Sequence, residues 1–126
     1  MAASTLLSII ESPAHPDFSA LYRRLGIREE RATSTRKAMS LLKHMTPDFV
    51  VAEFFYGYGN NYAGVNVSNL DVFLYSLQKY APQARIIVLV DKEERGFVEK
   101  LDALFPLHAV LLHPVREADL EAVLGE

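Results

Sequence analysis

Short apolar runs alternate along the chain with segments whose apolar residues recur every three or four positions. The apolar runs of strand length cover residues 6–10, 49–52, 85–90 and 109–112. Runs of this length that are almost entirely apolar are typical of strands buried on both faces of a sheet. A fifth segment, 28–33, has the length of a strand but is polar, so it can form only an edge strand.

The segments between and after these runs show the spacing of helices that bury one face. The residues expected to face inward are, in chain order, Phe18, Leu21, Tyr22, Leu25, Ala38, Leu41, Leu42, Met45, Leu70, Phe73, Leu74, Leu77, Phe97, Leu101, Leu104, Phe105, Leu120, Val123 and Leu124. Local signals mark several helix ends. Pro16 suits a first turn and Gly26 ends the first helix. Ser34 or Thr35 caps the second helix, and Asp91 caps the fourth.

Strands and helices alternate five times without a linker or an internal repeat, and 126 residues suffice for one domain. This alternation predicts a parallel sheet with helices on both faces, joined by right-handed crossovers. So short a chain favours the flavodoxin-like (βα)5 three-layer sandwich, with a parallel five-stranded sheet of order 2-1-3-4-5. The polar strand then takes the edge position, and residues 1–126 form a single domain.

The composition and charge of the chain exclude several functional classes. The net charge is −3 and the basic residues are scattered, unlike those of a nucleic-acid-binding surface. The absence of cysteine excludes disulfides and thiolate chemistry. No apolar run approaches the ~20 residues that span a bilayer, and no basic leader precedes the first apolar segment. We therefore expect a cytoplasmic protein that engages neither nucleic acid nor membrane.

The acid Glu53 directly follows a buried apolar run, at the carboxyl end of a central strand. In the order 2-1-3-4-5, the direction in which successive strands are added to the sheet reverses between strands one and three. Ligands of such folds bind in the crevice at the carboxyl ends of these two strands. Glu11 and Ser12 follow the first strand, while Val90 and His113 stand at the ends of the fourth and fifth. These residues are the candidates for a functional site.

This arrangement resembles the receiver domain of two-component response regulators over essentially the whole chain. In that family an acidic pair after strand one holds Mg²⁺, and Glu11-Ser12 occupies its place. An aspartate after strand three accepts the phosphoryl group, and Val50-Val51-Ala52-Glu53 puts a glutamate there. A Thr or Ser ends strand four, where this chain has Val90. A Lys-Pro pair follows strand five, where it has His113-Pro114. The resemblance implies a signalling module with a cis His113–Pro114 bond.

None of the family's key residue types is kept, and each departure has a chemical consequence. Ser12 removes one charge from the cation site, which leaves Glu11 and Glu53 as a weaker pair. Val90 has no hydroxyl for a phosphate oxygen, and His113 is neutral for much of the time near pH 7, where lysine is charged. We therefore expect a degenerate receiver, or pseudo-receiver. It would act by contact with a protein partner of a signalling system, without phosphorylation, enzymatic activity, metal or cofactor.

Two alternatives stay open. The first is an atypical response regulator that still accepts a phosphoryl group. The second is a small metal-dependent hydrolase that uses Glu11, Glu53, His113 and His15, because carboxylates and imidazoles suit zinc or manganese. No compact ligand spacing such as H-x-x-x-H supports the hydrolase.

The segment 54–69 is longer than the roughly 2–6 residues usual for loops in such folds. Its tyrosines and asparagines are typical of a contact loop; the candidates are Tyr56, Tyr58, Asn60, Asn61 and Tyr62. The alternative is a lid that folds over the crevice and buries Phe54 and Phe55. Both interpretations stay open.

The closing helix, 117–124, is short. Either its residues Leu120, Val123 and Leu124 are left under-covered and favour a homodimer, or the sequence is cut from a longer protein.

Overall fold

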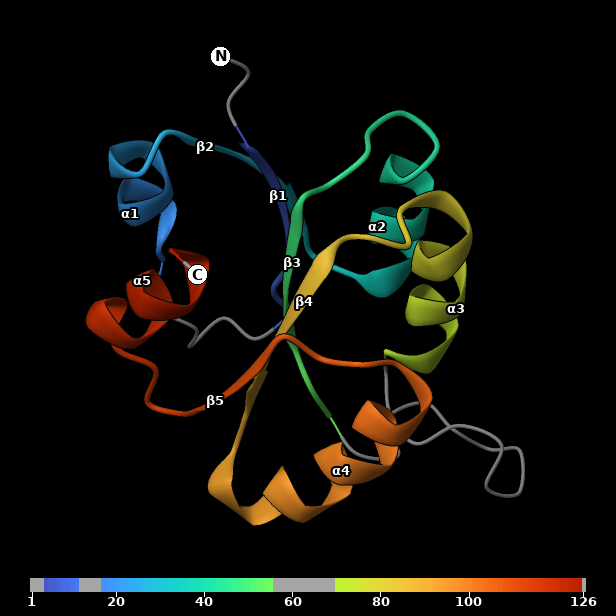
Figure 1. Cartoon of the computed structure of the whole chain (residues 1–126), viewed down its shortest axis with the longest axis vertical. Coiled ribbons are helices and arrows are strands. Elements are labelled where there is room, and N and C mark those ends of the chain that lie inside the picture. Colours follow the sequence, from blue (N-terminus) through green and yellow to red (C-terminus); the bar gives the residue numbers. More distant parts are fainter. Residues whose placement is uncertain (1–3, 12–16, 56–69, 126) are drawn as a thin grey trace.

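The computed structural model describes residues 4–11, 17–55 and 70–125. Five strands form one parallel sheet: β1 (Ser4–Ile9), β2 (Ile27–Ala32), β3 (Phe49–Glu53), β4 (Arg85–Val90) and β5 (Ala109–Leu112). The strand order is β2-β1-β3-β4-β5 (Figure 1). The predicted flavodoxin-like fold of order 2-1-3-4-5 is confirmed, and the polar strand β2 does occupy an edge.

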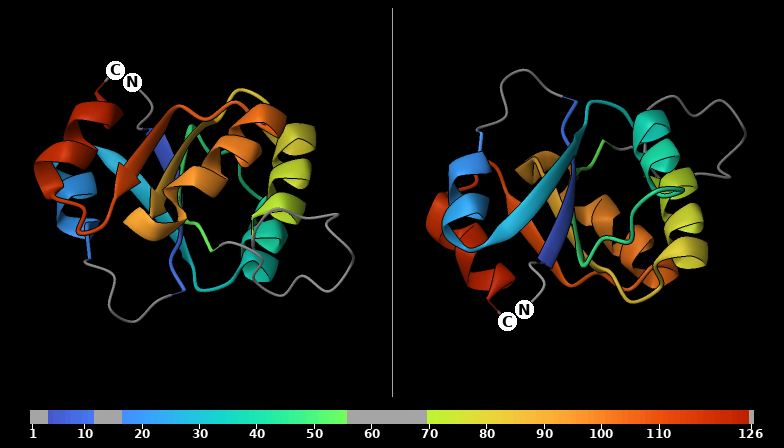
Figure 2. Two further views of the ribbon diagram at one scale, coloured as in Figure 1. Left: turned by 90° about the horizontal axis from the view of Figure 1, so that it is seen from below. Right: turned by 90° about the horizontal axis from the view of Figure 1, so that it is seen from above.

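Helices cover both faces of the sheet (Figures 1 and 2). They are α1 (Ser19–Arg24), α2 (Thr35–Leu41), α3 (Asp71–Tyr80), α4 (Arg95–Leu104) and α5 (Glu117–Leu124). The chain moves from β1 to β2 in one direction and from β3 through β5 in the other. Because each crossover is right-handed, α2, α3 and α4 lie on one face, whereas α1 lies with α5 on the other.

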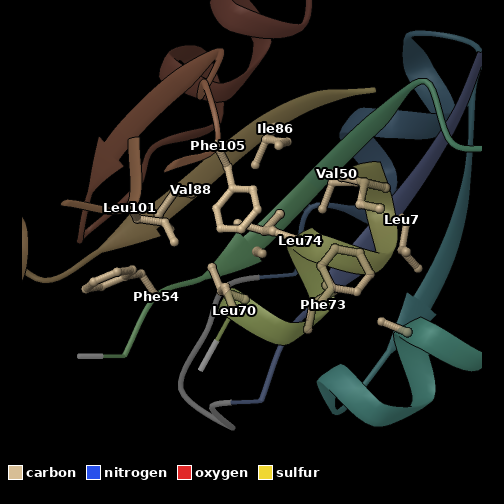
Figure 3. Packing of buried hydrophobic residues seen from close by; sticks show 14 of the residues in the cluster. Leu7, Val50, Phe54, Leu70, Phe73, Leu74, Ile86, Val88, Leu101 and Phe105 are labelled. Carbon is tan, nitrogen blue, oxygen red and sulfur yellow. The ribbon is translucent and has the colours of Figure 1, made fainter. Parts of the chain in front are cut away.

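The sheet supplies the centre of both hydrophobic layers, since successive side chains of a strand point to opposite faces. Val50 packs with α3 and α4, where Phe73, Leu74 and Leu101 fill the layer (Figure 3). Its neighbour Val51 packs toward α1 and α5. All five residues of β3 are buried. The central strand therefore has no solvent-facing side, which explains its continuous apolar run.

Helix α4 differs from its prediction in phase. Leu104, expected to be buried, is 48% exposed, and Val98 is buried beside Leu101 and Phe105. A 3₁₀ turn, Lys92–Glu94, precedes the helix, and Asp91 stands before this turn without forming a side-chain cap. Because α4 begins only after this turn, its inward face falls on positions 98, 101 and 105.

The ends of α1 and α2 carry two of the predicted signals. Ser34 caps α2, because its Oγ accepts a hydrogen bond of 3.1 Å from the Lys37 N–H. Gly26 follows α1 with φ of 74°, a left-handed conformation that suits glycine. Leu25, which was expected to face inward, is 37% exposed at this turn. Pro16 lies outside the described residues.

Helix α5 is better covered than the sequence suggested. Leu120 and Leu124 are buried in the layer formed with α1, and Val123 is partly buried against it. The expectation that these residues are under-covered is therefore wrong. The imidazole Nε2 of His108 also lies 3.0 Å from the Val123 carbonyl oxygen, which ties the last turn of α5 to the start of β5.

A carboxylate explains how the polar strand β2 joins the sheet. Glu29 accepts a hydrogen bond from the buried Ser8 of β1 at 2.7 Å and another from Ser19 of α1 at 2.6 Å. The phenol of Tyr22 is buried near this carboxylate. Burial, together with the negative charge of Glu29, raises the pKa of Tyr22 above its usual range. Glu29 thus links three elements through polar contacts where β2 offers few apolar ones.

Removal of this carboxylate should destabilise the fold measurably. Glu29→Ala leaves the hydroxyl of Ser8 without its acceptor in a buried position, and we expect the free energy of unfolding to fall by about 1–3 kcal/mol. Glu30→Ala is the matched control on the same strand, because Glu30 pairs only with the exposed Arg28 within the described residues, and should change stability by less than about 1 kcal/mol. Urea denaturation of both variants measures the difference. Equal losses would show that the network contributes nothing.

Candidate functional site

Glu53 ends β3 at the carboxyl edge of the sheet, where the candidate crevice was predicted. The residue is only 3% exposed. Its position is fixed by the neighbouring strand β4, since Glu53 pairs with Leu89 and the following N–H, of Phe54, donates to the Leu89 carbonyl at 2.8 Å. The carboxylate is thus held inside the protein, where it needs hydrogen-bond donors that water would otherwise supply.

One such donor comes from the chain just after β1. The backbone N–H of Glu11 donates to Oε1 of Glu53 at 2.7 Å. The preceding N–H, of Ile10, donates to the Ala32 carbonyl at 3.0 Å, on the β2 side. Successive N–H groups of an extended chain point to opposite sides, so residue 10 continues the pairing with β2 while residue 11 turns its N–H toward β3.

The contact between positions 11 and 53 therefore differs from the one that the sequence suggested. Glu11 and Glu53 were predicted to remain as the weakened carboxylate pair of a cation site, with no metal bound, and to hold a metal only in the alternative hydrolase. The structure brings them together through the main chain of Glu11 and the side chain of Glu53. This hydrogen bond does not depend on the acidic side chain of residue 11.

Val90 and His113 stand at the ends of the next two strands, as predicted. Val90 is fully buried and its carbonyl accepts the His113 N–H at 3.0 Å. His113 is partly buried, and its bond to Pro114 is cis, as the sequence predicted. Because β4 lies between β3 and β5, the backbones of Glu53 and His113 are two strand spacings apart, or roughly 10 Å.

Several predicted site residues lie outside the described residues. These are Ser12, His15, Tyr56, Tyr58, Asn60, Asn61 and Tyr62. At the start of the long connection, Phe54 is buried in the core and Phe55 is partly buried. In Figure 3, Phe54 lies at the margin of the apolar cluster, below Leu101.

The described ranges 4–11, 17–55 and 70–125 contain no group of three or more His, Asp or Glu side chains arranged to hold a metal ion. Within the same ranges no helix is long and apolar enough to cross a membrane.

The sequence analysis missed a buried acid near this edge. Asp71, 1% exposed, lies in the first turn of α3. The helix runs back antiparallel to β3, so its first turn lies at the edge of the sheet where Glu53 ends. A carboxylate in a first turn is favoured by the helix dipole. The signal available in the sequence was an acid directly after Leu70, at the start of a periodic apolar segment.

Several solved structures that superpose on this chain are described as receiver domains of response regulators or related proteins. The chemotaxis protein CheY4 of Vibrio cholerae superposes with a TM-score of 0.75 at 14% identity, covering 98% of both chains. A CheY-like receiver domain protein from Methanospirillum hungatei gives 0.71 at 11% identity, covering 98% of this chain and 92% of its own. A sensor histidine kinase receiver domain from Pseudomonas aeruginosa, with magnesium in its active site cleft, gives 0.71 at 17%, covering 98% and 95%.

This chain has the fold of a CheY-like receiver domain. At these identities the likeness shows the fold alone. No protein-family model matches the sequence, and no curated protein matches it. The receiver fold therefore rests on the topology and on the structural superpositions, and the chemistry of the crevice has to be argued from this chain's own residues.

The hydrogen bond from Glu11 to Glu53 can be tested at the level of single amides. We expect slow hydrogen exchange at the Glu11 amide, faster exchange in Glu53→Ala, and intermediate or unchanged exchange in Glu53→Gln, whose side-chain oxygen can still accept. The Ile10 amide, bonded to Ala32, is the internal control and should keep its protection. NMR-detected exchange measures all three. Equal Glu11 exchange in Glu53→Ala and in the unaltered protein would contradict the contact.

Proposed function

We propose that this protein is a pseudo-receiver, a signalling or scaffolding module that acts by protein–protein contact and does not depend on phosphorylation. The observation that carries this proposal is the state of Glu53. Its carboxylate stands where receivers place the phosphoacceptor, yet it is 3% exposed and its Oε1 is engaged by the Glu11 N–H at 2.7 Å. A carboxylate that attacks a phosphodonor needs an accessible oxygen and a bound divalent cation.

The neighbouring residues support the same proposal. Phosphoryl transfer needs donors and positive charge around the equatorial oxygens of the transferred group. Val90 offers no hydroxyl at the end of β4, and His113 stands where receivers have a lysine. A conformational switch also requires a ligand that binds one of two states more tightly. Without a hydroxyl at position 90, a phosphoryl group would stabilise the switched state little.

On this proposal, a permanent hydrogen bond takes the place of the transient contacts that a phosphoryl group would make. The Glu11 N–H donates to the Glu53 carboxylate and joins the ends of β1 and β3. In the proposed function the contact is constant and holds the chain in one conformation at the crevice. The functional output is then recognition of a protein partner of a signalling system by a constant surface. On this proposal the module is not an enzyme and works in the cytoplasm.

The phosphorylation-independent function makes a direct prediction. Incubation with a radiolabelled small phosphodonor and Mg²⁺ should give no labelled protein, and the oligomeric state should be unchanged. A receiver with the usual aspartate, threonine and lysine, treated in parallel, shows that donor and cation are active. Stoichiometric labelling that disappears in Glu53→Gln would instead establish the atypical phosphoacceptor.

The contact loop supplies a second prediction, which rests on the sequence because the loop lies outside the described residues. Tyr58→Ala together with Tyr62→Ala should weaken association with the partner, or self-association, and leave the unfolding midpoint nearly unchanged. Tyr75→Ala is the control for the loss of an exposed tyrosine outside the loop, and it should leave association unchanged. This tyrosine of α3 packs edgewise on Phe105, at 4.8 Å between ring centroids. Thermal unfolding and sedimentation velocity measure both effects. A sharp fall in the midpoint of the loop variant would make the two tyrosines core residues.

A further inference from the structure

A contact between α2 and α3 marks the middle of a surface on the side of the sheet away from α1 and α5. The two helices lie side by side (Figures 1 and 2). Oγ of Ser76, on α3, donates to Sδ of Met39, on α2, at 3.6 Å. Both residues are partly buried, so they form the floor of the seam between the helices.

Exposed side chains flank this contact along both helices. Residues three or four apart lie on one face of a helix. On α2, Arg36 comes one turn before the contact residue, and Lys43, in the turn that ends the helix, comes one turn after it. On α3, Val72 and Lys79 flank the contact residue in the same way. All four side chains are exposed; we call them the α2–α3 surface.

The basic residues, scattered along the sequence, are concentrated here in the fold. Segments 33–47 and 72–84 hold four of the 13 basic residues and none of the 16 acidic ones, so the rest of the chain sets nine basic residues against 16 acidic. Within the described part of the chain, Arg36, Lys43 and Lys79 form no ion pair. The α2–α3 surface is therefore a positive area on a negatively charged protein.

The two acids that border these segments lie away from the α2–α3 surface. Asp71 is 1% exposed. Oδ2 of Asp48 accepts the Thr5 N–H at 2.8 Å, which holds this carboxylate against the start of β1. Neither carboxylate therefore supplies the counter-charge for the exposed cations of the two helices.

The surface also contains an apolar position. Val72 is 53% exposed and stands between the basic positions of the two helices. Aromatic carbon lies at the other end, where the ammonium of Lys79 is 5.5 Å from the ring centroid of Tyr80. Burial of such side chains stabilises a complex only if the partner covers them with apolar groups of its own. The surface thus calls for a partner that is both acidic and partly apolar.

The distribution of charge limits the shape of that partner. A membrane or a nucleic-acid duplex is a polyanion wider than two helices, and it would also face the acidic remainder of the protein, which repels it. A single segment of polypeptide can cover the seam alone. The observations therefore favour an acidic protein segment over an extended polyanion.

We propose that the α2–α3 surface binds an acidic segment of the protein partner. Carboxylates of that segment pair with Arg36, Lys43 and Lys79, and an apolar side chain covers Val72. This inference rests on the proposed function, which requires a protein partner, and it adds where the partner binds and what its chemistry is.

Selection from random 12-residue peptides displayed on phage, with the whole chain as bait, tests the proposal. Selected peptides should be enriched in Asp and Glu and should contain a large apolar residue. The most enriched peptide is then synthesised and titrated into the ¹⁵N-labelled chain. Saturable shifts are expected at the amides of Arg36, Lys43, Val72 and Lys79, with an affinity that falls as salt rises from 50 to 300 mM.

Variants assign the binding to the surface. Arg36→Glu together with Lys43→Glu should weaken the peptide at least about tenfold, and Val72→Ser by about threefold or more. Arg23→Glu together with Lys92→Glu changes the net charge equally at exposed positions elsewhere, and it should bind as the unaltered protein does. The changed residues are exposed, so all three variants should keep their unfolding midpoint.

Three results would overturn the proposal: no enrichment of acidic peptides, equal weakening by both charge-reversal pairs, or equally tight binding to vesicles of phosphatidylserine and phosphatidylcholine. None of them bears on phosphorylation, which the radiolabelled phosphodonor tests without any peptide. Labelling of the protein at Glu53 would conversely overturn the phosphorylation-independent function and leave the peptide measurements as they stand. The two failures are thus distinguishable.

Discussion

A carboxylate at the end of a fully buried strand must be satisfied by the protein, because water cannot reach it. Glu53 is in this position, and the Glu11 N–H is one of the groups that satisfy it. The hydrogen bond joins the ends of β1 and β3, the two strands between which the strand order of the sheet reverses. It therefore lies at the place at which open α/β sheets usually bind their ligands. The proposed loss of phosphorylation and the proposed constant surface both follow from this contact.

The edge strand β2 shows how a polar segment can belong to a sheet that is otherwise apolar. Its carboxylate Glu29 binds serines on a strand and on a helix, so its desolvation is offset by two hydrogen bonds. Arg28, Glu30 and Arg31 stand on the same strand. Charges on an edge strand hinder pairing with another sheet. The polarity that made β2 the weakest apolar signal in the sequence thus serves both attachment and protection.

The fold followed from the sequence because its apolar periods are strong. Five strand–helix units and a polar edge leave little choice of topology, and the resemblance to receivers added the cis bond before Pro114. The errors have physical causes. The phase of α4 depends on a 3₁₀ turn, and residues 97 to 105 are apolar enough to allow two inward faces. The cover of Leu120 and Leu124 depends on α1, which is distant in sequence.

The sequence predicted which residues stand at the candidate site, but it did not predict the contacts that these residues make. The strand ends gave Glu11, Glu53, Val90 and His113, but no local pattern shows that Glu53 is buried or that it bonds to a main-chain group. The same holds for Ser8 and Ser19, which meet at Glu29 across 21 and 10 residues of chain. Contacts between distant residues depend on exact placement, and a single sequence does not record it.

Because residue 11 contributes its amide and not its carboxylate, the bond to Glu53 places an uneven constraint on evolution. Any amino acid except proline can donate this N–H, so the bond itself constrains the side chain at position 53 and not the one at position 11. As far as this bond is concerned, a related sequence can lack the acid that receivers keep at position 11, provided that it retains an acceptor side chain at the end of β3. A search that looks for the acidic pair would pass over such relatives.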